Sequence, residues 1–357
     1  MSLTRIWEGR MPAPLAWPLA ALAVGYRGLL GVREQLYDRQ LLKTRQLPCP
    51  VISIGNLTVG GTGKTPATEF TVRTLKECGL RPGIVSRGYG RRTRGSLIVA
   101  DPNGIRVEPA QAGDEPFLLA SRLPGTPVVV GENRYEAARL CVERLGVQAL
   151  VLDDAFQHRT LRKDLEIVLV SSHWPWGNGH LFPRGSLREP LGALARAHLV
   201  VVTGPSDGRD LPMISQTVSA KNPDCAVVTA RYEPVECWEA RSKARQSPAA
   251  LRGVRLYAFA GIARPENFVG TLEELGMSVA GFTEFPDHHW YRAKELEALA
   301  QEATAKGAGL LITTEKDAIR CLGLALPDTP LWTLAVRLAL TSGHAHWDGA
   351  FEPLRHR

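Results

Sequence analysis

Cysteine is scarce and scattered in this sequence. The chain has six cysteines among 357 residues, at positions 49, 78, 141, 225, 237 and 321, and none of them forms a Cys-x-x-Cys pair. This spacing argues against a disulfide framework and against a zinc site built from cysteines. We therefore expect reduced thiols and a cytoplasmic compartment.

Long apolar runs and low-complexity segments are also missing. The apolar stretch Ala13–Val24 is soon followed by Arg27, so it is shorter than the about 20 residues that a bilayer-spanning helix needs. Hydrophobic residues make up 44% of the chain and charged residues 22%, which is typical of a folded protein of one or two domains.

The charge balance is basic, with 43 Lys plus Arg against 36 Asp plus Glu and a net charge of +7. This balance fits anionic partners such as phosphorylated substrates or lipid headgroups, although a dispersed surface charge gives the same value. Nucleic acid is not expected as a partner, because the basic residues are not interleaved with aromatic residues at the spacing of a known binding module.

The N-terminal apolar residues have helical spacing. Leu15, Leu19, Leu22, Tyr26 and Leu29 would share one face of a helix, and arginines flank them. This pattern predicts an amphipathic helix over about residues 1–30 that lies on a membrane surface. An ordinary core helix is the main alternative. A signal peptide is a weaker one, because a nucleotide-binding pattern follows closely.

Short apolar runs alternate with amphipathic segments after residue 50. The expected strands are Val51–Ile54, Gly83–Ser86, Val128–Gly131, Ala149–Leu152, Ile167–Ser171 and Leu199–Thr203. The helices expected between them include Pro66–Cys78 and Arg134–Leu145. Apolar strands separated by helices are typical of a parallel sheet that is covered on both faces.

A second series of the same kind follows a polar segment. It comprises a strand at Arg255–Ala260, helices at Pro265–Leu275 and Lys294–Lys306, and a strand at Gly309–Thr313. We therefore predict an α/β fold with a P-loop domain over residues 1–225, a linker over 226–250 and a smaller α/β domain over 251–357. Within the linker, Ala226–Arg231 is a candidate strand onto which Leu331–Leu338 pairs back.

The strongest local pattern is a glycine-rich loop between a strand and a helix. It consists of Thr58, Val59, Gly60, Gly61, Thr62, Gly63, Lys64 and Thr65. Glycines let backbone N–H groups approach phosphate oxygens, a lysine reaches the β- and γ-phosphates, and a threonine hydroxyl binds Mg²⁺. The strict P-loop pattern has glycine where this chain has Thr58, but the strand, loop and helix context supports an ATP site.

Two acidic residues follow the strand Ala149–Leu152. Asp153 and Asp154 would lie at the carboxyl edge of the sheet, beside the P-loop. With Thr65 they form the predicted Mg²⁺ site. A strand-end turn with solvated acids is the alternative.

The chain resembles the tetraacyldisaccharide 4′-kinase family, the lipid A 4′-kinases. The resemblance rests on seven blocks in order: Ser53–Pro66, Ser86–Gly90, Gly113–Pro116, Asp153–His158, Pro183–Pro190, Phe285–His289 and Thr314–Ala318. It implies two α/β/α domains joined by a β linker, with the smaller domain closing over the nucleotide. It also implies ATP- and Mg²⁺-dependent phosphorylation of the 4′-hydroxyl of a tetra-acylated glucosamine disaccharide 1-phosphate, at the cytoplasmic face of the inner membrane.

The same resemblance implies roles for individual residues. Asp114 would be the general base, with His288 favoured over His289 as its partner, and Lys64 would act on the phosphates. Contacts to substrate or phosphate are expected from Arg87, Tyr89, Glu115, Arg134, Gln157 and Glu189. Local alternatives remain, since Asp114 suits a helix N-cap, Arg87 suits a solvated basic loop and Thr314–Asp317 suits a helix cap.

A membrane-associated P-loop regulatory ATPase is the alternative function. Two features argue against it. The chain has no Asn-Lys-x-Asp guanine-reading motif, and it has Val59 where partition-type ATPases carry an extra lysine. The tail after Arg320 matches no motif.

Overall fold

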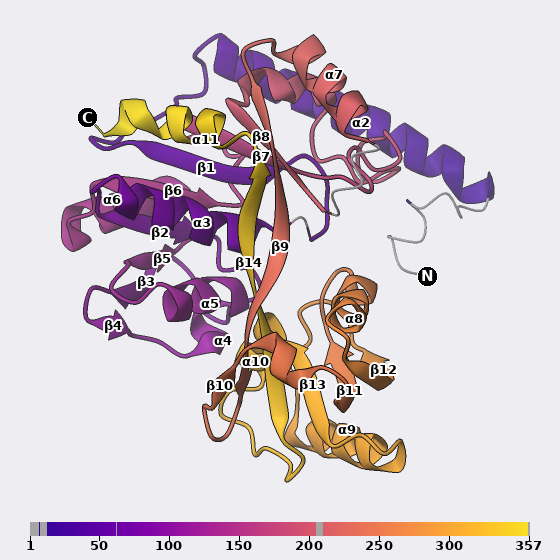
Figure 1. The fold of residues 1–357 in the computed structure, drawn as a ribbon. Coiled ribbons are helices and arrows are strands. Elements are labelled where there is room, and N and C mark those ends of the chain that lie inside the picture. Colours follow the sequence, from indigo (N-terminus) through magenta and orange to yellow (C-terminus); the bar gives the residue numbers. More distant parts are fainter. Residues whose placement is uncertain (1–6, 8–12, 62, 205–209, 356–357) are drawn as a thin grey trace.

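One mixed sheet passes through two lobes of the molecule (Figure 1). The computed structural model describes residues 7, 13–61, 63–204 and 210–355. Among these residues the strands form a 14-stranded sheet in the order β12-β11-β13-β14-β9-β8-β7-β1-β6-β2-β5-β3-β4, with β10 paired to β9. We call residues 13–225, with the helix α11 that packs on them, the first lobe, and residues 245–324 the second lobe.

The first lobe carries the P-loop segment. Its strands are β1 (Val51–Asn56), β2 (Pro82–Ser86), β3 (Leu97–Asp101), β4 (Gly104–Ile105), β5 (Val128–Val130), β6 (Ala149–Asp153), β7 (Leu165–Ser171) and β8 (Leu199–Thr203). Its helices are α2 (Ala13–Asp38), α3 (Lys64–Glu77), α4 (Pro109–Ala112), α5 (Asp114–Arg122), α6 (Arg134–Leu145) and α7 (Leu211–Lys221).

The second lobe is smaller. It contains β10 (Arg245–Gln246), β11 (Arg255–Ala260), α8 (Pro265–Glu274), β12 (Ser278–Glu284), α9 (Ala293–Ala305), β13 (Leu310–Thr314) and α10 (Glu315–Arg320). Two long strands, β9 (Ala226–Glu239) and β14 (Leu331–Ser342), connect the lobes, and α11 (His344–Phe351) ends the chain's regular structure. The predicted fold class, a parallel P-loop-type sheet with a second α/β unit, is confirmed.

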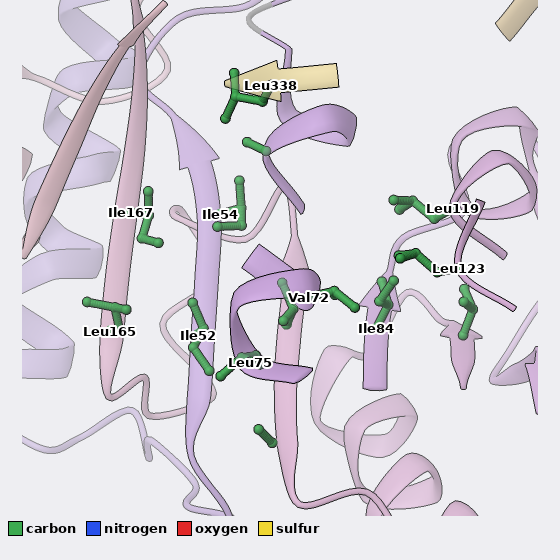
Figure 2. Packing of buried hydrophobic residues seen from close by; sticks show 14 of the residues in the cluster. Ile52, Ile54, Val72, Leu75, Ile84, Leu119, Leu123, Leu165, Ile167 and Leu338 are labelled. Atoms are coloured by element: carbon green, nitrogen blue, oxygen red, sulfur yellow. The ribbon is translucent and has the colours of Figure 1, made fainter. Parts of the chain in front are cut away.

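The core of the first lobe forms around β1. All six residues of β1 are buried, because β6 and β7 pair with it in parallel on its two sides and helices cover its faces. Ile52 and Ile54 pack with Val72 and Leu75 of α3 in the cluster drawn in Figure 2. This packing fixes α3 against β1, and the loop between them is the P-loop.

The segment predicted as a linker, residues 226–250, contains the 14-residue strand β9. β9 pairs with β14 antiparallel, from Glu239 opposite Trp332 to Thr229 opposite Ser342. Much of β9 is half-buried, so its polar residues at alternating positions face outward. That is why its sequence looks irregular. The expected pairing of Leu331–Leu338 with this segment is present.

The C-terminal tail returns to the first lobe, which corrects the predicted domain range 251–357. Leu338 of β14 belongs to the same buried cluster as Ile52 (Figure 2). Trp347 and Phe351 of α11 join this cluster, and Trp347 Nε1 donates to Thr74 Oγ1 at 3.1 Å. The tail therefore covers α3 from outside.

The predicted N-terminal helix is present as α2 and rests on the first lobe through one side only. Tyr26 donates to Arg188 O at 2.9 Å, and Arg33 pairs with Glu189 at 2.5 Å. Leu22 and Leu29, expected on the same face as Tyr26, are exposed, as are three other apolar side chains: Trp17, Val24 and Val32. The side chain of Leu15 lies outside the described part. No helix within the described residues is long and apolar enough to cross a bilayer.

The first prediction concerns α11. Trp347 is 2% exposed and its ring lies 4.9 Å from that of Phe70. We expect Trp347→Ala to lower the free energy of unfolding by about 3–5 kcal/mol, because it leaves a cavity and removes the hydrogen bond from Trp347 Nε1 to Thr74 Oγ1. Denaturant titration measures this loss. The control is Trp17→Ala, at a tryptophan that is 83% exposed. Equal small losses in both variants would show that α11 does not support α3.

Candidate active site

The P-loop lies between β1 and α3, and its glycines are required by geometry. Gly63 has φ 74°, and a Cβ at this position would meet the Tyr232 hydroxyl of β9 at 1.6 Å. A Cβ at Gly61 would lie 3.2 Å from Ala263 Cβ of the second lobe. Both lobes therefore touch the loop, and only glycine fits at Gly63. Thr62 lies outside the described residues.

The segment 181–190 supports the start of the loop. Val59 donates from its backbone to Ser186 O at 2.7 Å, and Arg188 donates from its backbone to Leu57 O at 2.7 Å. Thr58 forms an isolated bridge with Leu187. The block Pro183–Pro190, which carried part of the resemblance, is thus a brace for the P-loop backbone.

Two carboxylates sit beside the P-loop lysine at the end of β6. Asp154 Oδ1 lies 3.8 Å from Lys64 Nζ and accepts from Arg188 at 2.9 Å. Asp153 is 1% exposed and accepts from the hydroxyls of Thr68 and Ser86 at 3.2 and 3.1 Å. The acidic pair therefore lies where the sequence placed it.

The two carboxylates differ in their proton affinity. Burial, reinforced by the charges of Glu115 and Asp154, raises the pKa of Asp153 to about 6. Burial also acts to raise the pKa of Asp154, but the charges of Lys64 and Arg188 outweigh it and hold that pKa below its usual value. A divalent cation would stabilise the ionised form of a buried carboxylate such as Asp153.

The residues present fit a magnesium ion held together with phosphates. Thr65 is 1% exposed, and its Oγ1 is buried without a hydrogen-bond partner among the described residues. A buried hydroxyl without a partner is costly unless a ligand engages it. Within the described residues no group of three or more His, Cys, Asp or Glu is placed to hold a metal. Mg²⁺ usually takes one or two carboxylates plus phosphate oxygens and water.

Asp114 and His288 meet across the two lobes, as the resemblance led us to expect. His288 Nδ1 lies 3.0 Å from Asp114 Oδ2, although the residues are 174 positions apart. His289 instead lies 3.1 Å from Glu295. With Asp114 ionised, Nδ1 of His288 must carry the proton for this contact to be attractive. Nε2 of His288 is 3.9 Å from Asp287, beyond hydrogen-bond distance.

The pKa values of this pair move apart. The hydrogen bond to Asp114 raises the pKa of His288 above its usual value, against the effect of burial. Burial acts to raise the pKa of Asp114, but the hydrogen bond from His288 and the charges of Arg320 and Lys316 hold it well below its usual range. The pair therefore carries its titratable proton on the imidazole.

The other residues predicted to contact substrate occupy different surroundings. Arg87 and Tyr89 are exposed, and the Tyr89 ring lies 5.4 Å from that of His288. Arg134 is 5% exposed, and burial lowers its pKa to about 10 despite the opposing charges of Asp153 and Asp154. The charge of Arg87 also acts to lower the pKa of Arg134, so these two arginines lie near each other. Contacts of Arg87, Tyr89 and Arg134 to substrate stay predictions.

Three further predicted residues make contacts within the protein. Gln157 donates to Asn56 O at 2.9 Å, and Lys316 of α10 pairs with Glu115. Glu189 is 3% exposed, and its two oxygens accept from Arg33 of α2 and from Arg196. In this conformation Glu189 anchors α2 to the first lobe, and both of its carboxylate oxygens are engaged there.

Sequence reasoning missed Arg188 and Arg320 as parts of the site. Arg188 binds both oxygens of Asp154, at 2.9 and 3.1 Å. Arg320 binds Asp114 through Nε at 2.8 Å. Arg188 lies inside a block that carried the resemblance, so that block was a usable signal. Arg320 lies just beyond such a block, and no pattern pointed to it.

A glycine loop on a strand–helix junction, an orphaned threonine hydroxyl and acids at the end of a parallel strand define a P-loop nucleotide-binding protein. The family model described as LpxK, tetraacyldisaccharide-1-P 4′-kinase, matches residues 15–350. The chain belongs to this family.

Similar proteins agree with this assignment. A tetraacyldisaccharide 4′-kinase of Anaeromyxobacter dehalogenans (strain 2CP-C) is 43% identical over 327 residues, 89% of this chain and 85% of that protein. One of Syntrophus aciditrophicus (strain SB) is 40% identical over 340 residues, 90% of this chain and 91% of its own. The crystal structure of "apo" form LpxK from Aquifex aeolicus in complex with ATP has a TM-score of 0.74 at 30% identity, and covers 95% of this chain and 99% of its own.

The second prediction concerns His288. Asp114→Asn removes the carboxylate that raises the pKa of His288 and leaves burial, which lowers it. We therefore expect the imidazole of His288 to titrate at lower pH in this variant than in the wild type, as followed by NMR of histidine-labelled protein.

The matched control is Glu295→Gln, which removes the carboxylate partner of the neighbouring His289. It should leave the titration of His288 in place. An unchanged His288 pKa in Asp114→Asn would contradict the contact seen here.

Proposed function

We propose that this protein transfers the γ-phosphoryl group of ATP to the 4′-hydroxyl of a tetra-acylated glucosamine disaccharide 1-phosphate, in lipid A biosynthesis. Family membership and the names of its relatives support this acceptor. The observation that carries the proposal is the Asp114–His288 contact beside a P-loop. Such a pair suits the activation of an acceptor hydroxyl, which a regulatory ATPase does not need.

The acceptor hydroxyl needs a proton acceptor at neutral pH. In this mechanism the Asp114–His288 pair takes the proton, while the hydroxyl oxygen forms a bond to the γ-phosphorus and the bond to the β–γ bridging oxygen breaks to leave ADP. Asp114 holds the imidazole through Nδ1, so Nε2 is the atom that faces outward from the pair. Because the two members come from different lobes, the pair exists only when the lobes lie together.

Lys64 and the acidic residues serve the phosphate side of the reaction. Lys64 would neutralise charge that develops on the transferring group and its bridging oxygen. Thr65 and Asp153 would hold Mg²⁺, with Asp154 beside it, and the bound ion would screen the phosphate charge. The charges of Lys64 and Arg188 lower the pKa of Asp154, and Arg188 donates hydrogen bonds to both of its oxygens.

The exposed face of α2 supports a peripheral position on the cytoplasmic face of the inner membrane. Trp17 is 83% exposed, Val24 72% and Leu29 71%, which is costly in water and favourable in a lipid interface. Val24 also borders a groove of about 420 Å³, which is lined by apolar side chains and by Arg27, Arg184 and Lys221. This groove has the mixed character that an acylated, phosphorylated sugar requires.

The third prediction tests phosphate transfer. We expect Lys64→Ala to reduce kcat for transfer from ATP to the purified acceptor by far more than tenfold, because a positive charge at the reacting phosphate is lost. Lys76→Ala, at the far end of the same helix, should retain activity near the wild type. If Lys64→Ala kept more than about a tenth of wild-type kcat, the P-loop lysine would not serve this reaction.

The fourth prediction tests the membrane surface. Replacing Val24 and Leu29 by Asp should weaken sedimentation with anionic vesicles by at least about tenfold, since two apolar side chains no longer enter the interface. Val235→Asp, at a valine of β9 that is 43% exposed, is the control. Equal binding of both variants to vesicles would exclude α2 as the contact.

A further inference from the structure

Arg320 reaches from the second lobe to the carboxylate of Asp114. Its Nε donates to Asp114 Oδ2 at 2.8 Å, and one terminal nitrogen also contacts this oxygen. The other terminal nitrogen donates to Gly261 O at 2.7 Å and to Asp317 Oδ1 at 3.1 Å. All of its nitrogens are therefore used, and they join α10, the loop after β11 and the first residue of α5.

The side chain of Arg320 is fully buried, at 0% exposure. Burying a guanidinium is costly unless it is paired and fully hydrogen-bonded. Hydrophobic residues of similar volume often replace a buried ion pair without loss of stability. An arginine at this place is therefore better explained by what it does to Asp114 than by its contribution to folding.

Both carboxylate oxygens of Asp114 are hydrogen-bonded in this arrangement, so the orientation of the carboxylate is fixed. Its Oδ1 accepts from the backbone N of Glu115 at 2.9 Å. Its Oδ2 is shared between Arg320 and His288. The planar fork of Arg320 thus sets the orientation of the carboxylate, and the carboxylate in turn sets the orientation of the imidazole.

We propose that Arg320 is a positioning residue of the transfer reaction, which fixes Asp114 from the second lobe so that the Asp114–His288 pair faces the acceptor. This inference rests on the function proposed above and adds a residue to it. The contacts of Arg320 are to protein groups, namely Asp114, Gly261 O and Asp317. It acts through Asp114, and it makes the orientation of the pair depend on the contact between α10 and α5.

Other charged groups surround the Asp114–His288 pair and contribute to its pH dependence. Those that act on Asp114 are His288, Arg320 and Lys316, and those that act on His288 are Asp114, Asp287 and Glu115. Lys316 is paired with Glu115 and Arg320 also with Asp317. Arg320 is the cation in direct contact with the shared oxygen Oδ2, so its removal should have the largest effect on the proton affinity of the pair.

The test compares Arg320→Gln and Arg320→Lys with the wild type, by kcat and KM for the acceptor as functions of pH. Gln removes the positive charge, so the pair binds its proton more tightly and the acid limb of kcat should move to higher pH, by at least about half a unit. Lys keeps the positive charge but lacks the planar guanidinium group. In Arg320→Lys the acid limb of kcat should therefore move by no more than about half of that shift, while kcat itself falls. We expect about a tenfold or larger loss of kcat in both, with little change in KM.

Arg122→Gln is the matched control for a purely structural effect. Arg122 is a buried arginine of α5 that donates to Glu315 of α10 at 2.9 Å and to Glu69 at 2.8 Å, so it joins the same two helices without touching Asp114. It should lower the thermal stability and leave the acid limb in place. Soluble, folded protein is confirmed by its unfolding transition before each assay, and Arg320→Lys remains informative if Arg320→Gln does not fold.

Three outcomes separate the inference from the proposed function. An upward shift in Arg320→Gln, but not in Arg122→Gln, supports the positioning role. An unmoved acid limb in Arg320→Gln, or in its absence an unchanged kcat in Arg320→Lys, overturns it while wild-type transfer stands. If the wild type itself transfers no phosphate to the acceptor, the proposed function fails.

Discussion

The antiparallel pairing of β9 with β14 joins two half-sheets of mostly parallel strands into one sheet. This pairing runs from Glu239 opposite Trp332 to Thr229 opposite Ser342. On its other edge β9 pairs with β8 of the first lobe, and β14 pairs with β13 of the second lobe. Three features of the site depend on the pairing of β9 with β14. They are the contact of Asp114 with His288, the approach of Ala263 to Gly61 and the position of the Tyr232 hydroxyl beside Gly63. A change in the twist of these two strands would alter the phosphate side and the acceptor side of the site together.

Charge is distributed in the site so that each carboxylate has a different partner. Asp154 has Lys64 and Arg188, Glu115 has Lys316, and Asp114 has Arg320 and His288. Among the described residues, Asp153 accepts hydrogen bonds from the hydroxyls of Thr68 and Ser86, while burial and neighbouring carboxylates raise its pKa to about 6. A divalent cation brought with the nucleotide would supply the charge that is lacking there, which couples nucleotide binding to the ionisation of Asp153.

The sequence allowed the parallel strands of the first lobe, the P-loop and the acidic pair to be predicted, because each depends on a local pattern of apolar, glycine or acidic residues. It did not reveal the full length of β9, whose polar residues lie on the open face of a half-buried strand. It also misplaced the tail, because nothing local to Trp347 indicates that its partner is Phe70. Arg320 was missed for the same reason: its partner Asp114 is 206 positions away, and only the folded chain brings them together. The resemblance supplied the Asp114–His288 pairing, which composition and spacing alone could not.

Together the two lobes assemble a site for phosphate transfer to an acceptor, and this activity differs from simple ATP hydrolysis. The most direct measurement follows γ-labelled ATP in the presence and absence of purified tetraacyldisaccharide 1-phosphate, with ADP and labelled lipid quantified together. We expect one labelled lipid per ADP, labelled at the 4′-position, and almost no ADP without the acceptor. Release of ADP at the same rate without the acceptor, with the label recovered as free phosphate, would contradict it.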